Sequence, residues 1–328
     1  MAFIKGFVNF TSQDKKIMNI LIYGIGGIGG YFGGKLALTD HHITFIARGK
    51  QLKAIKENGL KIKSFLGDFH CTPSRVTEDP RKAPSPDLVI MGVKSWQLTQ
   101  AAEQIAPILN ENSLVLPLQN GVDNPTKLMK YIDQQHVLNG FCNLISYIES
   151  PGVLCHFAFN PTLTFGELDN TKSSRIQEID MVFKQAGIES IIPEDIHREQ
   201  WKKFMFITTI SAIGGLCRVP IGDLRESAYI LKLMRNTAEE ILSIAQAIGV
   251  DLRPTDIEKV IETVTQLDGQ STASTQRDLM AGKPSELDTF NGYIVKQAKK
   301  HGIPVPVNEM LYECLLPMEE QARSENLK

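Results

Sequence analysis

The sequence predicts an α/β domain built on a parallel sheet, followed by an all-helical domain. Short apolar runs alternate with helical periods in the first half, and a glycine-rich turn follows the first run directly. After Pro193 the apolar periodicity is helical throughout. A chain of 328 residues accommodates two domains. We predict an N-terminal extension (1–17), a nucleotide-binding domain (18–194) and a helical domain (195–328).

The first half divides into alternating strands and helices. Buried strands without polar alternation are typical of a parallel sheet covered on both faces. The predicted strands of this sheet are 20–23, 43–46, 88–91 and 114–116, with helices over 28–38 and 97–109. The predicted segments that follow are strands near 137–148, 153–159 and 163–165, a helix over 176–185 and a strand over 188–192.

The second half contains one marked helix start. Ser285 followed by Asp288 three positions later fits a capping box and predicts a helix beginning there. The expected buried stripe of this helix is Leu287, Phe290, Ile294 and Ala298.

Composition excludes several classes of protein. The 35 basic and 37 acidic side chains nearly cancel, so we expect neither a nucleic-acid nor a membrane surface. The five cysteines are dispersed, which predicts no metal site and buried thiols in a reducing compartment. Residues 1–17 lack the apolar core of a signal peptide, and 204–217 is too short and polar to span a bilayer. We expect a cytoplasmic protein.

The glycine-rich turn fits the dinucleotide-binding pattern GxGxxG. A predicted strand precedes it and a predicted helix follows, as a Rossmann nucleotide site requires. The first glycine permits the tight turn, the second lets the backbone approach a pyrophosphate, and the third allows close packing of helix on strand. The predicted cofactor-binding residues of this turn are Gly24, Gly26, Gly27, Ile28 and Gly29.

Arg48 follows the second predicted strand, where an NAD-dependent enzyme carries Asp or Glu for the ribose 2′-hydroxyl. A guanidinium there can stack on adenine and pair with a 2′-phosphate. The sequence therefore favours NADPH/NADP+ as cofactor. The alternative reading of Arg48 is a solvated turn residue.

Further motifs, in order, give the chain a resemblance to ketopantoate reductases (2-dehydropantoate 2-reductases) from Met18 to about Leu316. These motifs are Val93–Gln97, Leu118–Gly121, Phe165–Glu167, Trp201–Lys203, and Glu286 ahead of Asn291–Gly292. The resemblance implies a Rossmann domain and a helical domain like that of 6-phosphogluconate dehydrogenases. It also implies NADPH-dependent reduction of a small 2-oxo acid on the route to pantothenate and coenzyme A.

The resemblance implies that Lys203 and Glu286 are catalytic, that Lys94 and Asn120 lie near nicotinamide and substrate, and that Ser274 holds the substrate carboxylate. The chemistry agrees, because an ammonium can stabilise and protonate the oxygen of a ketone that receives hydride. No histidine occupies a convincing position for this role. The alternative readings are an exposed helix lysine and a capping carboxylate.

Three positions depart from the family pattern, which has asparagine at each. They are Ile207, Ser211 and Ser271. We expect Lys203, Ile207 and Ser211, spaced by four, to share the helix face that lines the cleft. An unpaired polar group of the substrate costs about 1–3 kcal/mol, so these positions bear on substrate choice.

Three functional hypotheses follow. The first is a ketopantoate reductase. The second is a paralogous NADPH-dependent reductase of another, more apolar 2-oxo acid or ketone, and the third is a catalytically silent NADP-binding sensor. The sequence leaves the oligomeric state open, with a homodimer as one arrangement.

Overall fold

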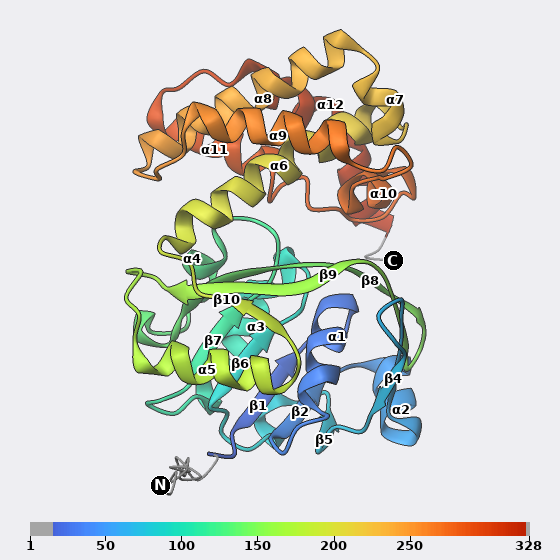
Figure 1. Cartoon of the computed structure of the whole chain (residues 1–328), viewed down its shortest axis with the longest axis vertical. Helices are drawn as coiled ribbons and strands as arrows, with labels where there is room; N and C mark the ends of the chain where they lie inside the picture. The colour runs from blue at the N-terminus through green and yellow to red at the C-terminus, as the bar shows by residue number, and fades with distance from the viewer. Residues whose placement is uncertain (1–15, 326–328) are drawn as a thin grey trace, which may run out of the picture.

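The computed structural model describes residues 16–325, which form an α/β domain and a helical domain stacked along the long axis (Figure 1). The predicted extension over residues 1–17 lies outside the described residues except for its last two. Helix α6 (Ile196–Cys217) leads from the α/β domain into the helical one. The predicted boundary at residue 194 lies beside its start and stays a prediction.

The first sheet is five-stranded and parallel, with order β5-β2-β1-β6-β7. The four predicted strands of this sheet are confirmed, and their residues are almost entirely buried. Strand β1 lies at the centre of the sheet, and the strand order reverses there, with β2 on one side and β6 on the other. Such a reversal in a parallel sheet places a ligand crevice at the carboxyl ends of β1 and β6. The strands are β1 (Asn19–Tyr23), β2 (His42–Ile46), β5 (Arg75–Thr77), β6 (Leu88–Met91) and β7 (Leu114–Pro117).

Helices and short helical turns surround this sheet. The predicted helices over 28–38 and 97–109 are confirmed as α1 and α3, the latter with a 3-10 turn at each end. The elements are α1 (Gly27–Leu36), α2 (Gly49–Asn58), α3 (Leu98–Ile105), α4 (Asn124–Leu128) and α5 (Ser174–Gln185), with 3-10 turns at Pro80–Lys82, Ser95–Gln97, Ala106–Ile108 and Gln134–His136.

A second sheet, which the sequence analysis did not separate from the first, has order β10-β9-β3-β4 with β8 also paired to β9. Its hairpin of β8 and β9 runs along the boundary with the helical domain (Figure 1). The strands are β3 (Leu60–Ser64), β4 (Phe69–Cys71), β8 (Leu138–Ser150), β9 (Val153–Glu167) and β10 (Glu189–Ile191).

The prediction of separate strands over 153–159 and 163–165 is wrong, because both belong to β9. Between the pairs Asn143↔Thr162 and Ile145↔Ala158, β9 has two more residues than β8. This bulge contains Pro161, which has no N–H for the ladder, and Phe159 in the left-handed region (φ 63°). The sequence shows a strand breaker there, and the bulge accommodates it without ending the strand.

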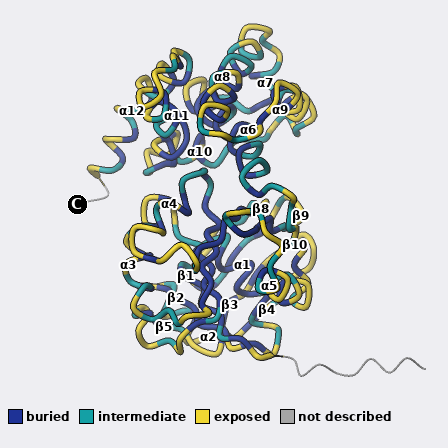
Figure 2. Tube along the Cα trace, turned by 90° about the vertical axis from the view of Figure 1, so that its left-hand side faces the viewer, coloured by how far each residue is buried: buried dark blue, intermediate teal, exposed yellow. Residues whose placement is uncertain are grey.

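Beyond residue 195 the described chain contains helices and no strand. Aromatic side chains of α6, α11 and the turn before α11 form the centre of one of its two cores, where Phe204 contacts Trp201, Phe290 and Tyr293 edge to face. Figure 2 shows buried segments inside both domains. The remaining helices are α7 (Ile221–Arg225), α8 (Ala228–Ala247), α9 (Pro254–Gln266), α10 (Ser274–Met280), α11 (Asn291–His301) and α12 (Pro306–Glu325).

The prediction that a helix begins at Ser285 is wrong, since α11 begins at Asn291. Ser285 Oγ accepts from Leu287 N (3.2 Å), but the segment up to Phe290 folds into turns. Leu287, Phe290, Ile294 and Ala298 are all buried, as predicted, because both the turn and the helix face the core.

Two further expectations can be compared with the described residues. Cys71 and Cys142 are buried, whereas Cys217 and Cys314 are exposed, so the prediction of uniformly buried thiols is wrong. Exposed faces of α6 and α12 place these two thiols outward. No helix of the described chain has the length and apolar character needed to cross a bilayer.

Phe204→Ala should destabilise the protein by about 3–5 kcal/mol, because it removes a buried ring at the centre of the helical core. Urea unfolding followed by circular dichroism measures this change. Tyr229→Ala is the control, since Tyr229 is 73% exposed and should change stability by less than about 0.5 kcal/mol. Equal effects of the two substitutions would contradict the packing described.

Candidate active site

The glycine turn joins the end of β1 to the start of α1. Gly24 has φ 98°, and a Cβ there would lie 2.7 Å from the Val93 side chain. A Cβ on Gly29 would lie 2.1 Å from Gly24 O. Both positions therefore need glycine for the internal packing of turn, helix and strand, as the motif predicts.

Gly26 and Gly27 differ from this pair. A Cβ on Gly26 would meet nothing closer than Gly92 O at 4.0 Å, so the backbone at Gly26 is open. A Cβ on Gly27 would lie 2.2 Å from Ser146 O, and Ser146 Oγ donates to Gly27 O at 3.1 Å. The hairpin strand β8 thus closes over the start of α1, a contact that no sequence motif announced.

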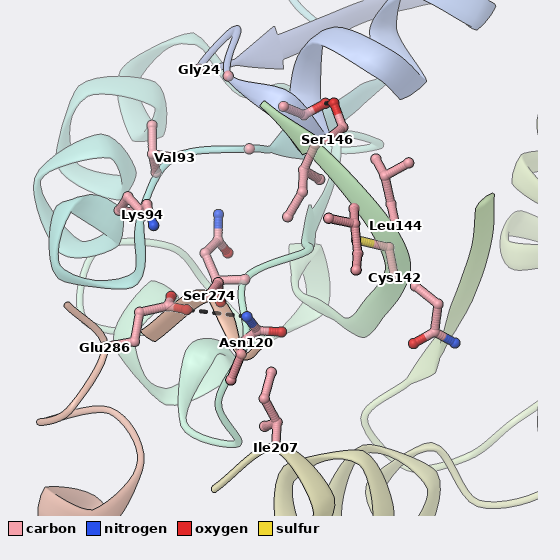
Figure 3. A pocket seen from close by; sticks show the side chains of 18 of the residues that line it. Gly24, Val93, Lys94, Asn120, Cys142, Leu144, Ser146, Ile207, Ser274 and Glu286 are labelled. Carbon is pink, nitrogen blue, oxygen red and sulfur yellow. Dashed lines mark hydrogen bonds between the residues drawn. The ribbon is translucent and has the colours of Figure 1, made fainter. Parts of the chain in front are cut away.

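A cavity of about 980 Å³ begins at this turn and extends between the two domains. Figure 3 shows its walls: the glycine turn, strand β8, the segments after β6 and β7, and residues of the helical domain. The predicted site residues that line it are Gly24, Gly26, Gly27, Ile28, Arg48, Lys94, Asn120, Lys203, Ile207, Ser271, Ser274 and Glu286. Residues from seven separate stretches of sequence therefore meet in one cleft.

Two predicted site residues do not line the cavity. Gly29 packs against the turn behind it. Ser211 is 1% exposed and lies off the lining, where Ile210 takes its place. On an α-helix, Ile210 points within about 20° of the direction of Lys203, whereas Ser211 points about 80° away from it. The prediction that Ser211 shares the cleft face is therefore wrong.

Lys203 extends from α6 across the domain boundary to the backbone of β8. Its Nζ donates to Cys142 O (2.5 Å) and lies 5.3 Å from the centre of the Phe141 ring. Burial lowers the pKa of Lys203 below its usual range, and the neighbouring Cys142 and Glu286 partly oppose this effect. Burial also raises the pKa of Cys142 to about 11, so its thiol stays neutral.

Glu286 faces the cavity from the turn before α11, and its side chain accepts from Asn120 Nδ2 at 3.1 Å (Figure 3). The residue is 5% exposed. It lies in a turn and not in the first turn of a helix, since α11 begins at Asn291. The hydrogen bond instead ties the carboxylate to the segment after β7, so the two predicted residues come together across the domain boundary.

The charges in the cleft are mostly positive. Of the described residues that line it, Arg48, Lys94, Lys203 and Arg277 are basic and Glu286 is acidic. Arg277 was not predicted and lies on α10, where its Nη1 donates to Thr272 O (2.5 Å). An excess of positive charge suits a ligand with phosphate and carboxylate groups.

Several lining residues were missed by sequence reasoning. Gln97 and Gln100 add polar groups to the cavity wall, and Leu144 and Phe206 add apolar surface. Gln51 joins the predicted Arg48 segment to the site, because its side chain donates to Ile25 O (3.2 Å). For the glutamines, the available signal was that they lie close in sequence to residues of the motifs. The residues of β8 could not be found in this way, because their place depends on how the hairpin packs.

Other chemistries find no support in the described part of the chain. No histidine lines the cavity. No group of three or more His, Cys, Asp or Glu side chains has an arrangement for a metal ion among residues 16–325. Lysine is the cationic acid that the cleft offers to a carbonyl oxygen.

A Rossmann sheet, a helical domain and a cleft with a half-buried lysine define an oxidoreductase of the dinucleotide-binding class. Two family models, ketopantoate reductase PanE/ApbA and its C-terminal counterpart, match residues 20–170 and 195–319. The chain belongs to the ketopantoate reductase family, which confirms the resemblance predicted from its motifs.

Individual relatives agree with this assignment. The uncharacterized oxidoreductase YkpB of Bacillus subtilis is 28% identical, over 91% of this chain and 98% of its own length. The 2-dehydropantoate 2-reductase of Pyrococcus horikoshii is 29% identical, over 90% and 95%. Among solved structures, a PanE/ApbA family ketopantoate reductase from Ralstonia eutropha has a TM-score of 0.85 and 29% identity, covering 93% of this chain and 100% of its own.

A solved structure of an enzyme with a different name has a similar fold. D-mandelate dehydrogenase, solved with NADH and anilino(oxo)acetate, has a TM-score of 0.85 at 21% identity, covering 93% of this chain and 100% of its own. This second likeness is one of fold.

Gly26→Ala should leave the fold intact and weaken nicotinamide dinucleotide binding by about tenfold or more, a cost of about 1.4 kcal/mol. The reason is that a methyl group has room inside the protein and would meet only the ligand. Fluorescence titration and the thermal midpoint measure the two effects.

Gly29→Ala is the matched comparison and should lower the thermal midpoint, because its Cβ would meet Gly24 O. Undiminished affinity in Gly26→Ala would show that the ligand does not approach this backbone.

Proposed function

We propose that the protein catalyses the NADPH-dependent reduction of 2-dehydropantoate (ketopantoate) to pantoate, on the route to pantothenate and coenzyme A. The observation that carries the proposal is that one cavity joins the glycine turn to Lys203, Asn120 and Glu286. Relatives named 2-dehydropantoate 2-reductase, at 26–29% identity, support it.

The cofactor end of the cleft fits a dinucleotide. The open backbone at Gly26 precedes the first turn of α1, whose N–H groups favour a pyrophosphate. Arg48 is exposed and lines the cavity beside Tyr23. Burial raises the pKa of the Tyr23 hydroxyl, and the charge of Arg48 and its hydrogen bond to Tyr23 partly oppose this rise. Reduced nicotinamide, when bound, supplies the hydride.

The substrate end supplies a proton and orientation. The Lys203 ammonium would stabilise charge developing on the ketone oxygen and then donate its proton. Its bond to Cys142 O fixes the direction from which Nζ enters the cavity. Glu286 and Asn120 would bind the substrate hydroxyl, and Ser274 and Ser271 its carboxylate. Lys94, which also lines the cavity, would lie near the nicotinamide and the substrate.

The second candidate function is the reduction of another, more apolar 2-oxo acid or ketone. Ile207 and Ile210 line the cavity in the turns of α6 that follow Lys203, with Leu144 and Phe206 also on its walls. Apolar side chains leave a substrate hydroxyl unpaired unless Glu286 or Asn120 reaches it. The fold alone does not choose, because D-mandelate dehydrogenase shares it.

Arg48→Ala should weaken NADPH binding about 10- to 100-fold and weaken NADH binding far less. A charge-assisted bond to the 2′-phosphate contributes about 1.5–3 kcal/mol and NADH lacks that group. Titration of both dinucleotides measures this. Lys53→Ala removes a charge from an exposed position on α2, the helix that follows Arg48, and is the control. Equal losses for NADPH and NADH would refute the 2′-phosphate role.

Lys203→Ala should lower kcat by about 10²- to 10⁴-fold, because the proton donor is lost. Reduction needs the charged form, so wild-type activity should fall as pH rises through the lowered pKa of Lys203, below 10.5. In Lys203→Arg the guanidinium stays charged and this alkaline decline should disappear. NADPH oxidation with 2-dehydropantoate across pH measures both effects.

Lys202→Ala is the control, since Lys202 pairs with Glu199 (2.5 Å) and does not line the cavity. Unchanged turnover in Lys203→Ala would remove this mechanism. Tight NADPH binding by the wild-type protein without turnover would instead favour a silent NADP-binding sensor.

A further inference from the structure

The turn that carries Glu286 has no helix to hold it. Glu286 O accepts from Thr289 N and Phe290 N, both at 3.0 Å, which closes the turn but does not fix where it lies. The residue before it, Ser285, is completely buried. The contacts of Ser285 therefore decide where the Glu286 side chain enters the cleft.

Helix α12 provides those contacts through two side chains one turn apart. Ser285 N donates to both carboxylate oxygens of Glu319 (3.1 and 2.9 Å), and Ser285 Oγ donates to Glu319 Oε2 (2.5 Å). Arg323 Nη2 donates to Ser285 O at 3.2 Å. Both backbone polar groups of Ser285 are thus bonded to α12.

Glu319 is 1% exposed and pairs with Arg323 at 2.6 Å. A buried carboxylate is costly unless it is paired and its remaining lone pairs accept hydrogen bonds. Here the arginine and the three donations from Ser285 meet that need together. Such charge-assisted bonds are short and directional, so the arrangement holds one geometry.

The same turn is held from the α/β domain. Ser95 Oγ and Thr289 Oγ1 form a buried hydrogen bond of 2.8 Å. The Arg323 guanidinium lies 5.1 Å from the centre of the Trp96 ring, against which Lys94 Nζ also lies (5.6 Å). Arg323 therefore contacts the turn and the segment that follows β6 at once.

We propose that Glu319 and Arg323 are positioning residues that set the orientation of Glu286 in the cleft and, through Trp96, couple it to Lys94 in the other domain. Neither side chain lines the cavity, so they act through Ser285 and not on the substrate. The proposal rests on the proposed function for its kinetic consequence, while the geometry of the turn can be measured without it.

The first test is Glu319→Gln, which keeps the size of the side chain and removes the charge that pairs with Arg323. We expect kcat with 2-dehydropantoate to fall about 10- to 100-fold, since displacement of a site residue by about 1 Å can cost about 10²-fold. NADPH affinity should stay within about twofold of wild type, because the glycine turn is untouched. Hydrogen exchange at the Ser285 amide should become faster.

Two comparisons separate positioning from general damage. Glu320→Gln changes the adjacent, exposed carboxylate of α12 and should retain wild-type kcat and exchange. Trp96→Ala should lower kcat, whereas Trp96→Phe keeps an aromatic face for Arg323 and should restore most of it. If Glu319→Gln fails to fold, Arg323→Lys, which keeps the charge and loses the planar fork, replaces it.

Wild-type kcat together with unchanged exchange at Ser285 in the folded variant would overturn the proposal. So would a loss in Trp96→Phe as large as in Trp96→Ala. If the wild-type protein reduces no 2-oxo acid, the proposed function fails, and exchange at Ser285 still decides whether α12 holds the turn.

Discussion

The contact between Lys203 and the backbone of β8 is the interaction on which the candidate site depends. Lys203 belongs to the first helix of the helical domain, while Cys142 O, its acceptor at 2.5 Å, belongs to the α/β domain. The contact therefore brings a desolvated ammonium to the cleft that begins at the glycine turn. It also requires the β8–β9 hairpin to pass along the domain boundary, where Figure 1 shows it.

Local signals in the sequence were sufficient for four of the five strands of the parallel sheet, β5 being missed, and for most of the cleft. Apolar runs identify β1, β2, β6 and β7, and the turn after each carries residues that topology must bring to one edge. Local signals gave wrong predictions where contacts between residues distant in sequence determine the conformation. Pro161 ends a strand in isolation but is accommodated by the pairing of β9 with β8, and Ser285 resembles an N-cap although Glu319, distant in sequence, determines its conformation.

The site residues follow the same division. Gly24, Arg48 and Lys203 were predictable from motif and chemistry, and all three line the cavity. Ser211 was predicted to line the cleft because it follows Ile207 by four residues. On an α-helix, however, a step of one residue turns the side chain by about 100°, so Ile210 lines the cavity and Ser211 lies in the core. Ser146 and Arg277 could not be predicted, because their place in the cleft depends on how the hairpin and α10 pack. The result is a positively charged cavity with an apolar wall beside the lysine.

Oxidation of NADPH by the purified protein, followed by absorbance with 2-dehydropantoate and a panel of more apolar 2-oxo acids, tests this account most directly. The account predicts hydride transfer to a 2-oxo acid, with 2-dehydropantoate the best substrate if Glu286 and Asn120 pair its hydroxyl. Preference for an apolar acid would assign substrate choice to Ile207 and Ile210. Tight NADPH binding without turnover of any member of the panel would contradict the role given to the cleft.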